Sequence, residues 1–144
     1  EEWLSIIERH GLDPQQRIFE ITESLFMQGN EHHLERIDAL RKAGCRIAID
    51  DFGTGFSALS YLHRFPIQSL KIDQSFVAGL EGEARAESLA LVRAILALAG
   101  TIGIETIGEG VETARQRDVL RRLGCLYGQG FLYGSPRPFD AIGS

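Results

Sequence analysis

The sequence has few cysteines, no long apolar run and no excess of positive charge. Its two cysteines, Cys45 and Cys125, are too few for a disulfide framework and lack the spacing of a metal motif. We expect both to be small core residues of a protein in a reducing cytoplasm. The longest apolar stretch, residues 89–100, contains Arg93 and is too short to cross a bilayer.

The net charge of −5 provides no basic field that would attract a DNA or RNA duplex or an anionic membrane surface. An acidic chain can still bind an anionic substrate, but it then needs metal ions or basic residues at the site. The chain has no initial Met and starts inside an amphipathic helical pattern, residues 3–7. We therefore expect these 144 residues to be part of one domain in a longer protein.

Helical and extended patterns alternate along the chain. Strands are predicted over residues 17–22, 46–50, 69–73, 104–109 and 125–129. Helices are predicted over residues 2–10, 31–43, 57–63, 86–99 and 113–123. Repeated strand–helix units predict a parallel sheet, which forms either an open doubly wound sheet or a (β/α) barrel.

The two faces of the predicted strands differ, and this difference favours the barrel. Glu20 lies on the face opposite Phe19 in the first strand, and Asp50 lies opposite Ile49 in the second. An open sheet with helices on both faces would bury these carboxylates. A barrel gathers them at the C-terminal ends of its strands, where barrel active sites lie. We therefore expect a partial (β/α)8 TIM-like barrel, about the last five strand–helix units, with the three N-terminal strands missing.

Four carboxylates would meet at this rim, namely those of Glu20, Asp50, Asp51 and Glu109. Carboxylates that lie close together repel one another unless protons or cations neutralise them. Oxygen ligands without His or Cys favour Mg²⁺ or Mn²⁺. The pair Asp50-Asp51, with Asp50 at the strand end and Asp51 on the following loop, suits the two ions used in phosphoryl hydrolysis.

Lys71 would point into the same rim, where a lysine can orient a water molecule and offset developing charge. The loop of Gly53, Thr54 and Gly55 can approach a ligand closely. Each signal has a simpler explanation when taken alone: a solvated rim carboxylate, a helix cap or a salt-bridge partner. The placement of all of them at strand ends is what indicates a functional site.

Five segments occur in a fixed order along the chain. They are Glu20-Ile-Thr-Glu-Ser, Asp50-Asp51-Phe-Gly-Thr-Gly, Lys71-Ile-Asp, Glu109-Gly-Val-Glu-Thr and Gln129-Gly-Phe-Leu-Tyr-Gly-Ser-Pro. This set resembles the motifs of the EAL-type cyclic di-GMP phosphodiesterase family in order and spacing. The resemblance covers nearly the whole chain, and the combination of motifs is highly specific.

The resemblance implies a barrel that hydrolyses cyclic di-GMP to linear pGpG with two Mg²⁺ or Mn²⁺ ions, in bacterial second-messenger signalling. It implies that Glu20 and Asp50 bind one ion, and that Asp50, Asp51 and Glu109 serve the other. Lys71 would hold the nucleophilic water, and Glu109 is also a candidate general base.

The resemblance gives other residues supporting roles. Glu23 would order the loop after Asp51, and Glu112 would support the site from behind the metal ligands. Asp73 and Gln129 would line the cleft for substrate and metal.

The resemblance also implies partners besides cyclic di-GMP. Family members often form homodimers near the loop that carries Phe56 and Tyr61 here. Upstream sensor or GGDEF domains are compatible with this segment. We expect the segment to be cytoplasmic without direct membrane contact, even where other domains anchor the parent protein to a membrane.

Two expected metal ligands are absent from the sequence. The Glu-Ala-Leu motif that names the family is missing, as is an Asn ligand from the next strand. Smaller departures are Gly108, where relatives usually have Ala, and Leu126, where Asp is common; we expect both to be tolerated. The missing ligands predict weak or absent turnover by the isolated chain. A non-catalytic cyclic di-GMP receptor and a dimerisation module therefore remain alternatives.

Overall fold

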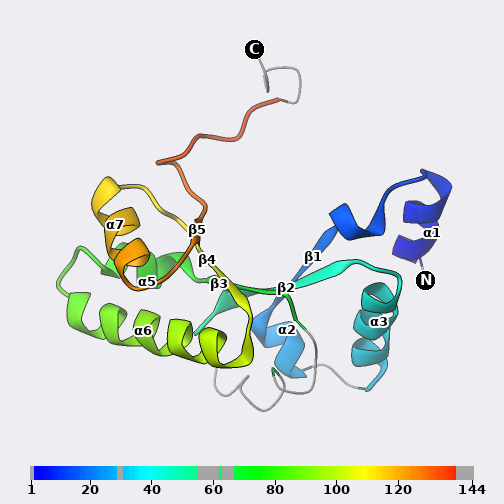
Figure 1. Cartoon of the computed structure of the whole chain (residues 1–144), viewed down its shortest axis with the longest axis horizontal. Helices are drawn as coiled ribbons and strands as arrows, with labels where there is room; N and C mark the ends of the chain where they lie inside the picture. Colours follow the sequence, from blue (N-terminus) through cyan, green and yellow to red (C-terminus); the bar gives the residue numbers. More distant parts are fainter. Residues whose placement is uncertain (1, 29–30, 55–61, 63–66, 139–144) are drawn as a thin grey trace.

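The computed structural model describes residues 2–28, 31–54, 62 and 67–138, and these form one mixed α/β unit (Figure 1). The strands are β1 (Ile18–Thr22), β2 (Arg46–Phe52), β3 (Ser69–Ile72), β4 (Glu105–Gly108) and β5 (Tyr127–Gly128). The helices are α1 (Glu2–Arg9), the 3-10 turn η1 (Pro14–Gln16), α2 (Glu23–Gln28), α3 (Glu31–Lys42), α5 (Gln74–Gly79), α6 (Arg85–Ile102) and α7 (Ala114–Arg122).

The five strands form a single sheet in the order β1-β2-β3-β4-β5, and every neighbouring pair is parallel. Each strand lies beside its neighbour in the chain, as in successive units of a (β/α) barrel. A doubly wound sheet would instead reverse its strand order at a switch point. The predicted parallel sheet is confirmed, and its order is that of the barrel rather than of the open alternative.

One face of the sheet is apolar and covered by helices. Ile49 of β2 and Leu70 and Ile72 of β3 have no exposed surface, and Val92 of α6 is equally buried. Helix α6 packs on β3 and β4, whereas α2 packs on β1 and β2. Burying aliphatic side chains of this size stabilises the fold by roughly 1.5–3 kcal/mol each, so this face fixes which way every strand is turned.

Helix boundaries follow the cap chemistry of the sequence. Helix α7 starts after Thr113, whose hydroxyl accepts from Gln116 N while the Gln116 side chain accepts from the Thr113 N–H, which together make a capping box. Helix α6 ends at Gly103, which adopts φ +73° and so supplies the left-handed residue that terminates many helices. The start of α7 agrees with the sequence prediction, whereas α6 continues three residues past its predicted end at residue 99.

Three predicted strand boundaries were wrong. Strand β2 continues two residues past Asp50, so Asp51 belongs to the strand rather than to the loop. Strand β3 ends at Ile72, because Asp73 caps α5 by accepting from Ser75 N. Strand β5 covers only two residues. The predicted helix 57–63 falls outside the described residues except for Leu62, which is buried, and the predicted dimer contact of Phe56 and Tyr61 lies outside them.

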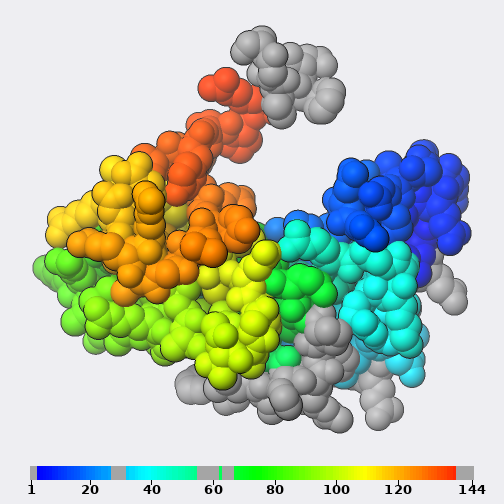
Figure 2. Space-filling model, viewed as in Figure 1, coloured from blue at the N-terminus to red at the C-terminus, as the bar shows by residue number. Residues whose placement is uncertain are grey.

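The cysteines behave as the sequence predicts, since both Cys45 and Cys125 are buried free thiols. Among the described helices, none combines the length and apolar character needed to cross a membrane. The surface is uneven: α1 and the C-terminal segment project from the body of the molecule, and the surface between them is hollowed (Figure 2).

Candidate active site

A buried lysine lies among carboxylates from three other segments of the chain. Lys71, on β3, is 4% exposed. Its Nζ lies 2.7 Å from Glu109 Oε1, 3.0 Å from Asp50 Oδ1 and 3.0 Å from Glu20 Oε2. These residues come from four neighbouring segments of one parallel sheet, so their side chains meet at its C-terminal edge as the sequence predicts.

The strand register explains why the side chains meet. Thr22 pairs with Asp50 and Lys71 pairs with Ile107, so the C-terminal ends of the strands lie at nearly the same height. Side chains alternate along each strand. The helix-facing positions therefore require Glu20, Asp50 and Lys71 to point to the opposite, inner face. Glu109 follows β4 directly, and its N–H donates to Ile72 O at 3.1 Å.

The adjacent aspartates both reach the site because the strand is irregular where they lie. The pairing of β2 with β3 shifts register between Ile49 and Phe52. Asp51 adopts φ +53°, a left-handed conformation that aspartate tolerates better than most residues. A bulge of this kind re-aims a side chain that would otherwise point to the opposite face. One carboxylate oxygen each from Asp50, Asp51 and Glu109 lies within 4.8 Å of the other two.

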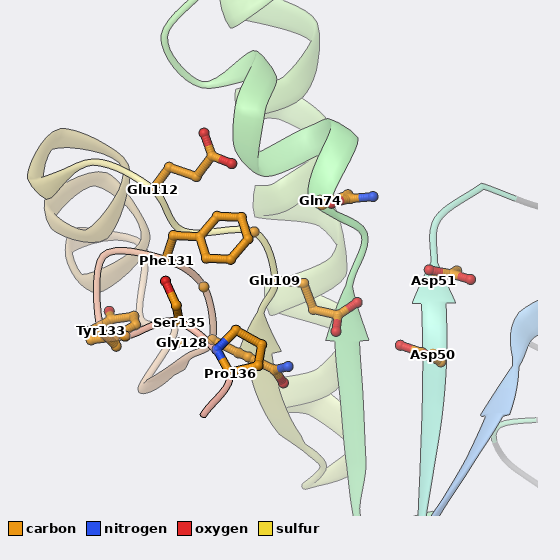
Figure 3. A pocket seen from close by; sticks show the side chains of 14 residues that line it. Asp50, Asp51, Gln74, Glu109, Glu112, Gly128, Phe131, Tyr133, Ser135 and Pro136 are labelled. Carbon is orange, nitrogen blue, oxygen red and sulfur yellow. The ribbon is translucent and has the colours of Figure 1, made fainter. Parts of the chain in front are cut away.

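Figure 3 shows the same arrangement from close by. Asp50 and Asp51 lie at the end of one strand, and the Glu109 carboxylate points toward them from the segment after β4, on the other side of β3. This convergence confirms that the three side chains form one cluster, with Glu20 joined to it through Lys71.

Burial and mutual repulsion govern the charges of the cluster. Burial tends to lower the pKa of Lys71, but its close contacts with the carboxylates of Glu109, Asp50 and Glu20 outweigh that effect and raise the pKa, so the ammonium stays charged. Burial raises the pKa of Glu109; Lys71 opposes this rise and Asp50 adds to it. Burial also raises the pKa of Asp51, and the charges of Asp50 and Asp73 raise it further. The single lysine therefore leaves the carboxylates short of positive charge.

The donor set fits a divalent cation. Its ligands are carboxylate oxygens alone, as hard ions such as Mg²⁺ and Mn²⁺ prefer. Asp50 Oδ1 is buried and accepts no well-directed hydrogen bond from a described residue, although Lys71 Nζ lies 3.0 Å away. The ammonium of Lys71 attracts this oxygen at that distance, but its orientation leaves a lone pair of Asp50 Oδ1 available to another positive group. A buried acceptor of this kind is costly unless another positive group uses it.

The loop after Asp51 is held by a buried glutamate. Glu23, at the start of α2, is 2% exposed, and its Oε2 accepts from Gly53 N at 2.9 Å. Gly53 adopts φ +104°, and a Cβ at this position would lie 2.7 Å from the ring of Phe76. Thr54 Oγ1 donates to Asp51 O. The predicted contact of Glu23 with this loop is present, whereas Gly55 lies outside the described residues.

A cavity of about 730 Å³ opens beside the carboxylates. Gln129 lines it, as predicted. Glu112, predicted to support the site from behind the metal ligands, also lines the cavity, and its carboxylate lies apart from that of Glu109 (Figure 3). Asp73 does not line this cavity. Its carboxylate instead accepts from Ser75 N at 2.9 Å and also receives the Ser75 hydroxyl, so it caps α5 beside Asp51.

Several cavity residues were not singled out from the sequence. Gln74 forms part of the wall from α5, and Phe131, Tyr133 and Pro136 contribute an aromatic and apolar side. Phe131 keeps 65% of its surface exposed, which is high for an aromatic side chain that lines a cavity. The run of aromatic residues after Gln129 is the signal that could have indicated this wall.

Comparison with known proteins places these features in a family. Residues 1–136 match the family model described as "EAL domain". The chain is 43% identical over 134 residues to the bifunctional diguanylate cyclase/cyclic di-GMP phosphodiesterase MucR of Pseudomonas aeruginosa. This match covers 93% of the chain and 19% of MucR. It is 38% identical over 134 residues to the cyclic di-GMP phosphodiesterase RocR of the same organism. This match covers 93% of the chain and 34% of RocR.

Solved structures agree with the sequence matches. A MucR phosphodiesterase in complex with c-di-GMP is 42% identical with a TM-score of 0.89, and the match covers 95% of this chain and 55% of that one. A manganese/c-di-GMP complex of BlrP1 from Klebsiella pneumoniae is 34% identical with a TM-score of 0.79, and the match covers 91% of this chain and 33% of the BlrP1 chain. The chain thus spans about a fifth of the length of the first curated relatives it matches.

Proposed function

The chain belongs to the EAL domain family, and we propose that its site takes part in metal-dependent hydrolysis of cyclic di-GMP to linear pGpG in bacterial signalling. The observation that carries this proposal is the cluster of Asp50, Asp51 and Glu109, whose oxygens lie within 4.8 Å of one another beside a charged lysine. The similarity to MucR, solved as a c-di-GMP complex, supports the choice of substrate.

Asp50, Asp51 and Glu109 would hold divalent ions, with Glu20 contributing to the site of one of them. Mg²⁺ and Mn²⁺ are the ions we propose, and the manganese complex of BlrP1 supports this choice. When bound, two such ions stabilise the attacking and the leaving oxygens of a phosphodiester displacement. The negative cluster would otherwise repel the anionic substrate, so the ions are also needed for binding.

Lys71 and Glu109 would handle the attacking water. Lys71 Nζ is a fixed donor, and it can hold the oxygen of a water molecule between the carboxylates. The raised pKa of Glu109 makes it a better proton acceptor than an ordinary carboxylate. Attack forms one phosphorus–oxygen bond and breaks the bond to a ribose oxygen. The ring opens, and the freed hydroxyl takes up a proton.

We propose that the chain is the C-terminal portion of one barrel domain. Five strands are described, whereas a complete barrel of this kind has eight. The 55% coverage of the MucR phosphodiesterase chain supports this division. The second candidate is a segment that holds cyclic di-GMP or dimerises without turnover, since the five described strands supply only part of a barrel site. In either case, we propose a cytoplasmic segment of a protein that forms homodimers and carries sensor or GGDEF domains.

The proposal is tested by incubating the purified chain with cyclic di-GMP and Mn²⁺ and separating pGpG by chromatography, alongside calorimetric titration of Mn²⁺. Glu109→Gln should abolish product and weaken metal binding. Glu105→Gln is the matched control, because Glu105 starts β4, the strand that Glu109 follows, but pairs with Arg46 at 2.8 Å, away from the metal cluster. Metal binding together with product that Glu109→Gln abolishes would support the enzyme. Absence of metal binding would contradict the enzyme and favour the non-catalytic candidate, which does not require a metal ion.

A further inference from the structure

A glutamate outside every recognised motif contacts the loop between β4 and α7. Glu81 follows α5, and its Oε2 accepts a hydrogen bond from Thr113 Oγ1 at 2.9 Å. Arg115 Nε lies 3.9 Å from Glu81 Oε1 and adds a weaker attraction. The Glu81 side chain is 23% exposed, so the contact with Thr113 is partly protected from water. Hydrogen bonds to a charged group are about twice as strong as neutral ones.

Thr113 closes a small hydrogen-bond network at the end of this loop. Its hydroxyl oxygen accepts from Gln116 N at 3.1 Å. The buried Gln116 Oε1 accepts the N–H groups of Glu112 at 2.8 Å and of Thr113 at 3.0 Å. The Thr113 hydroxyl has one hydrogen to donate, and Glu81 is the acceptor that takes it. Of these contacts, only the one with Glu81 joins the end of the loop, Glu112 and Thr113, to a residue outside the loop and α7.

Helix α5, which precedes Glu81, is closely packed. Val77 and Leu80 have no exposed surface. A Cβ at Gly79 would lie 2.1 Å from Ser88 Oγ, so α5 and α6 touch with no room between them. At the other end of α5, Gln74 contacts the loop, because a Cβ at Gly110 would lie 2.7 Å from Gln74 Cβ. Helix α5 and the residues after it thus contact both ends of the loop.

The contact with Glu81 acts on Glu112 rather than on the metal cluster. Glu109 is held separately, since its N–H donates to Ile72 O, and Val111 is held by Gln129 O. The Glu112 carboxylate makes no ion pair or hydrogen bond with a described residue and lines the cavity beside Phe131 (Figure 3). A free carboxylate next to an exposed aromatic ring suits a guanine base, which stacks on the ring and presents N–H donors to the oxygens.

We infer that Glu81 is a positioning residue for ligand binding, which acts through Thr113 to fix Glu112 at the base-binding side of the cavity. The inference rests on the proposed function for the identity of the ligand. The contact between Glu81 and the loop is independent of it. Loss of the contact should loosen residues 110–113 and weaken ligand binding, while the metal cluster keeps its affinity.

The first test is hydrogen–deuterium exchange of the whole chain, which needs neither metal nor turnover. Glu81→Ala should speed exchange of the amides of Glu112 and Thr113 about tenfold, the factor expected for one hydrogen bond to a charged group. Glu81→Gln retains an acceptor oxygen and should restore most of the protection. Glu83→Ala is the matched control, because Glu83 is exposed two residues away. Unchanged exchange in Glu81→Ala would overturn the inference.

The second test separates positioning from general destabilisation. Calorimetry with Mn²⁺ alone and with cyclic di-GMP in the presence of Mn²⁺ gives the two affinities for each variant. Glu81→Ala should weaken cyclic di-GMP binding about fivefold to tenfold and change the Mn²⁺ affinity less than twofold. Parallel loss of both affinities, or an unchanged ligand affinity, would overturn the positioning role. A wild-type chain that binds no cyclic di-GMP refutes the proposed function, and the exchange data then still decide whether Glu81 holds the loop.

Discussion

Replacing Lys71 by Met should destabilise the metal-free protein and make its stability depend on added metal. Met has a similar length and leaves the hydrophobic contacts of the stem largely intact, so the main change is loss of the charge. Breaking a buried ion pair by removing one partner costs about 3–5 kcal/mol. Glu20 is half exposed and contributes little, whereas Asp50 and Glu109 retain only 24% and 16% of their side-chain exposure.

We therefore expect the lower end of this range for Lys71→Met, about 3 kcal/mol, which corresponds to a midpoint lower by about 10 °C. The assay is thermal and urea unfolding in EDTA and in millimolar Mn²⁺. Added Mn²⁺ should stabilise Lys71→Met more than the wild type, because the ion neutralises carboxylates that have lost their ammonium. Lys42→Met, which removes a 70% exposed lysine paired with Asp38, is the control and should leave the midpoint unchanged.

Equal midpoints for Lys71→Met and wild type in EDTA would refute the reasoning, since the carboxylates would then not depend on the lysine. A destabilised variant that gains nothing from Mn²⁺ would show that the charge of the lysine stabilises the fold but that the carboxylates do not form a metal site. The two halves of the prediction thus test the ion pairs and the metal site separately.

The remaining predictions concern the supports of the site. Glu23→Ala should cost about 2 kcal/mol in urea unfolding, because it leaves the partly buried N–H of Gly53 without its acceptor at 2.9 Å, while Glu23→Gln should cost less. Gly110→Ala should cost about 2 kcal/mol in the same assay, since φ is +64° and the new Cβ would lie 2.7 Å from Gln74 Cβ. Cys45 and Cys125 should react with a thiol reagent at pH 8 only after unfolding, because burial raises the pKa of both thiols and shields them.

The alternation of side chains was sufficient to predict the inner face of the sheet. Glu20, Asp50 and Lys71 could be assigned to one face because the opposite positions are aliphatic, and the buried aliphatic face determines the register. Glu109 could be placed at the rim because it ends the fourth predicted strand, although the positions opposite it, Thr106 and Gly108, are not aliphatic. Pairwise distances could not be predicted, because they depend on how far each strand slides along its neighbour.

Features that depend on local backbone irregularity could not be predicted from the sequence. The bulge at Asp51 needs a left-handed aspartate and a register shift, and neither leaves a hydrophobic pattern. Helix α5 has only six residues, too few for a helical period to be visible. The contact between Glu81 and Thr113 joins residues 32 positions apart through a loop, so no spacing rule identifies it. These are contacts that tertiary packing creates after the strands are placed.

Lys71 explains how such a concentration of carboxylates is compatible with a stable fold. In the absence of metal, its ammonium lies within 3.0 Å of Glu20, Asp50 and Glu109, and this neutralises part of the repulsion among them. If divalent ions neutralised the same carboxylates, as proposed, the ammonium would no longer be required for that purpose, and its hydrogens would be available to a water molecule at the same place. The group that stabilises the metal-free fold is then the donor that the proposed chemistry needs, because the central strand of the sheet places it between the ligands of both neighbours.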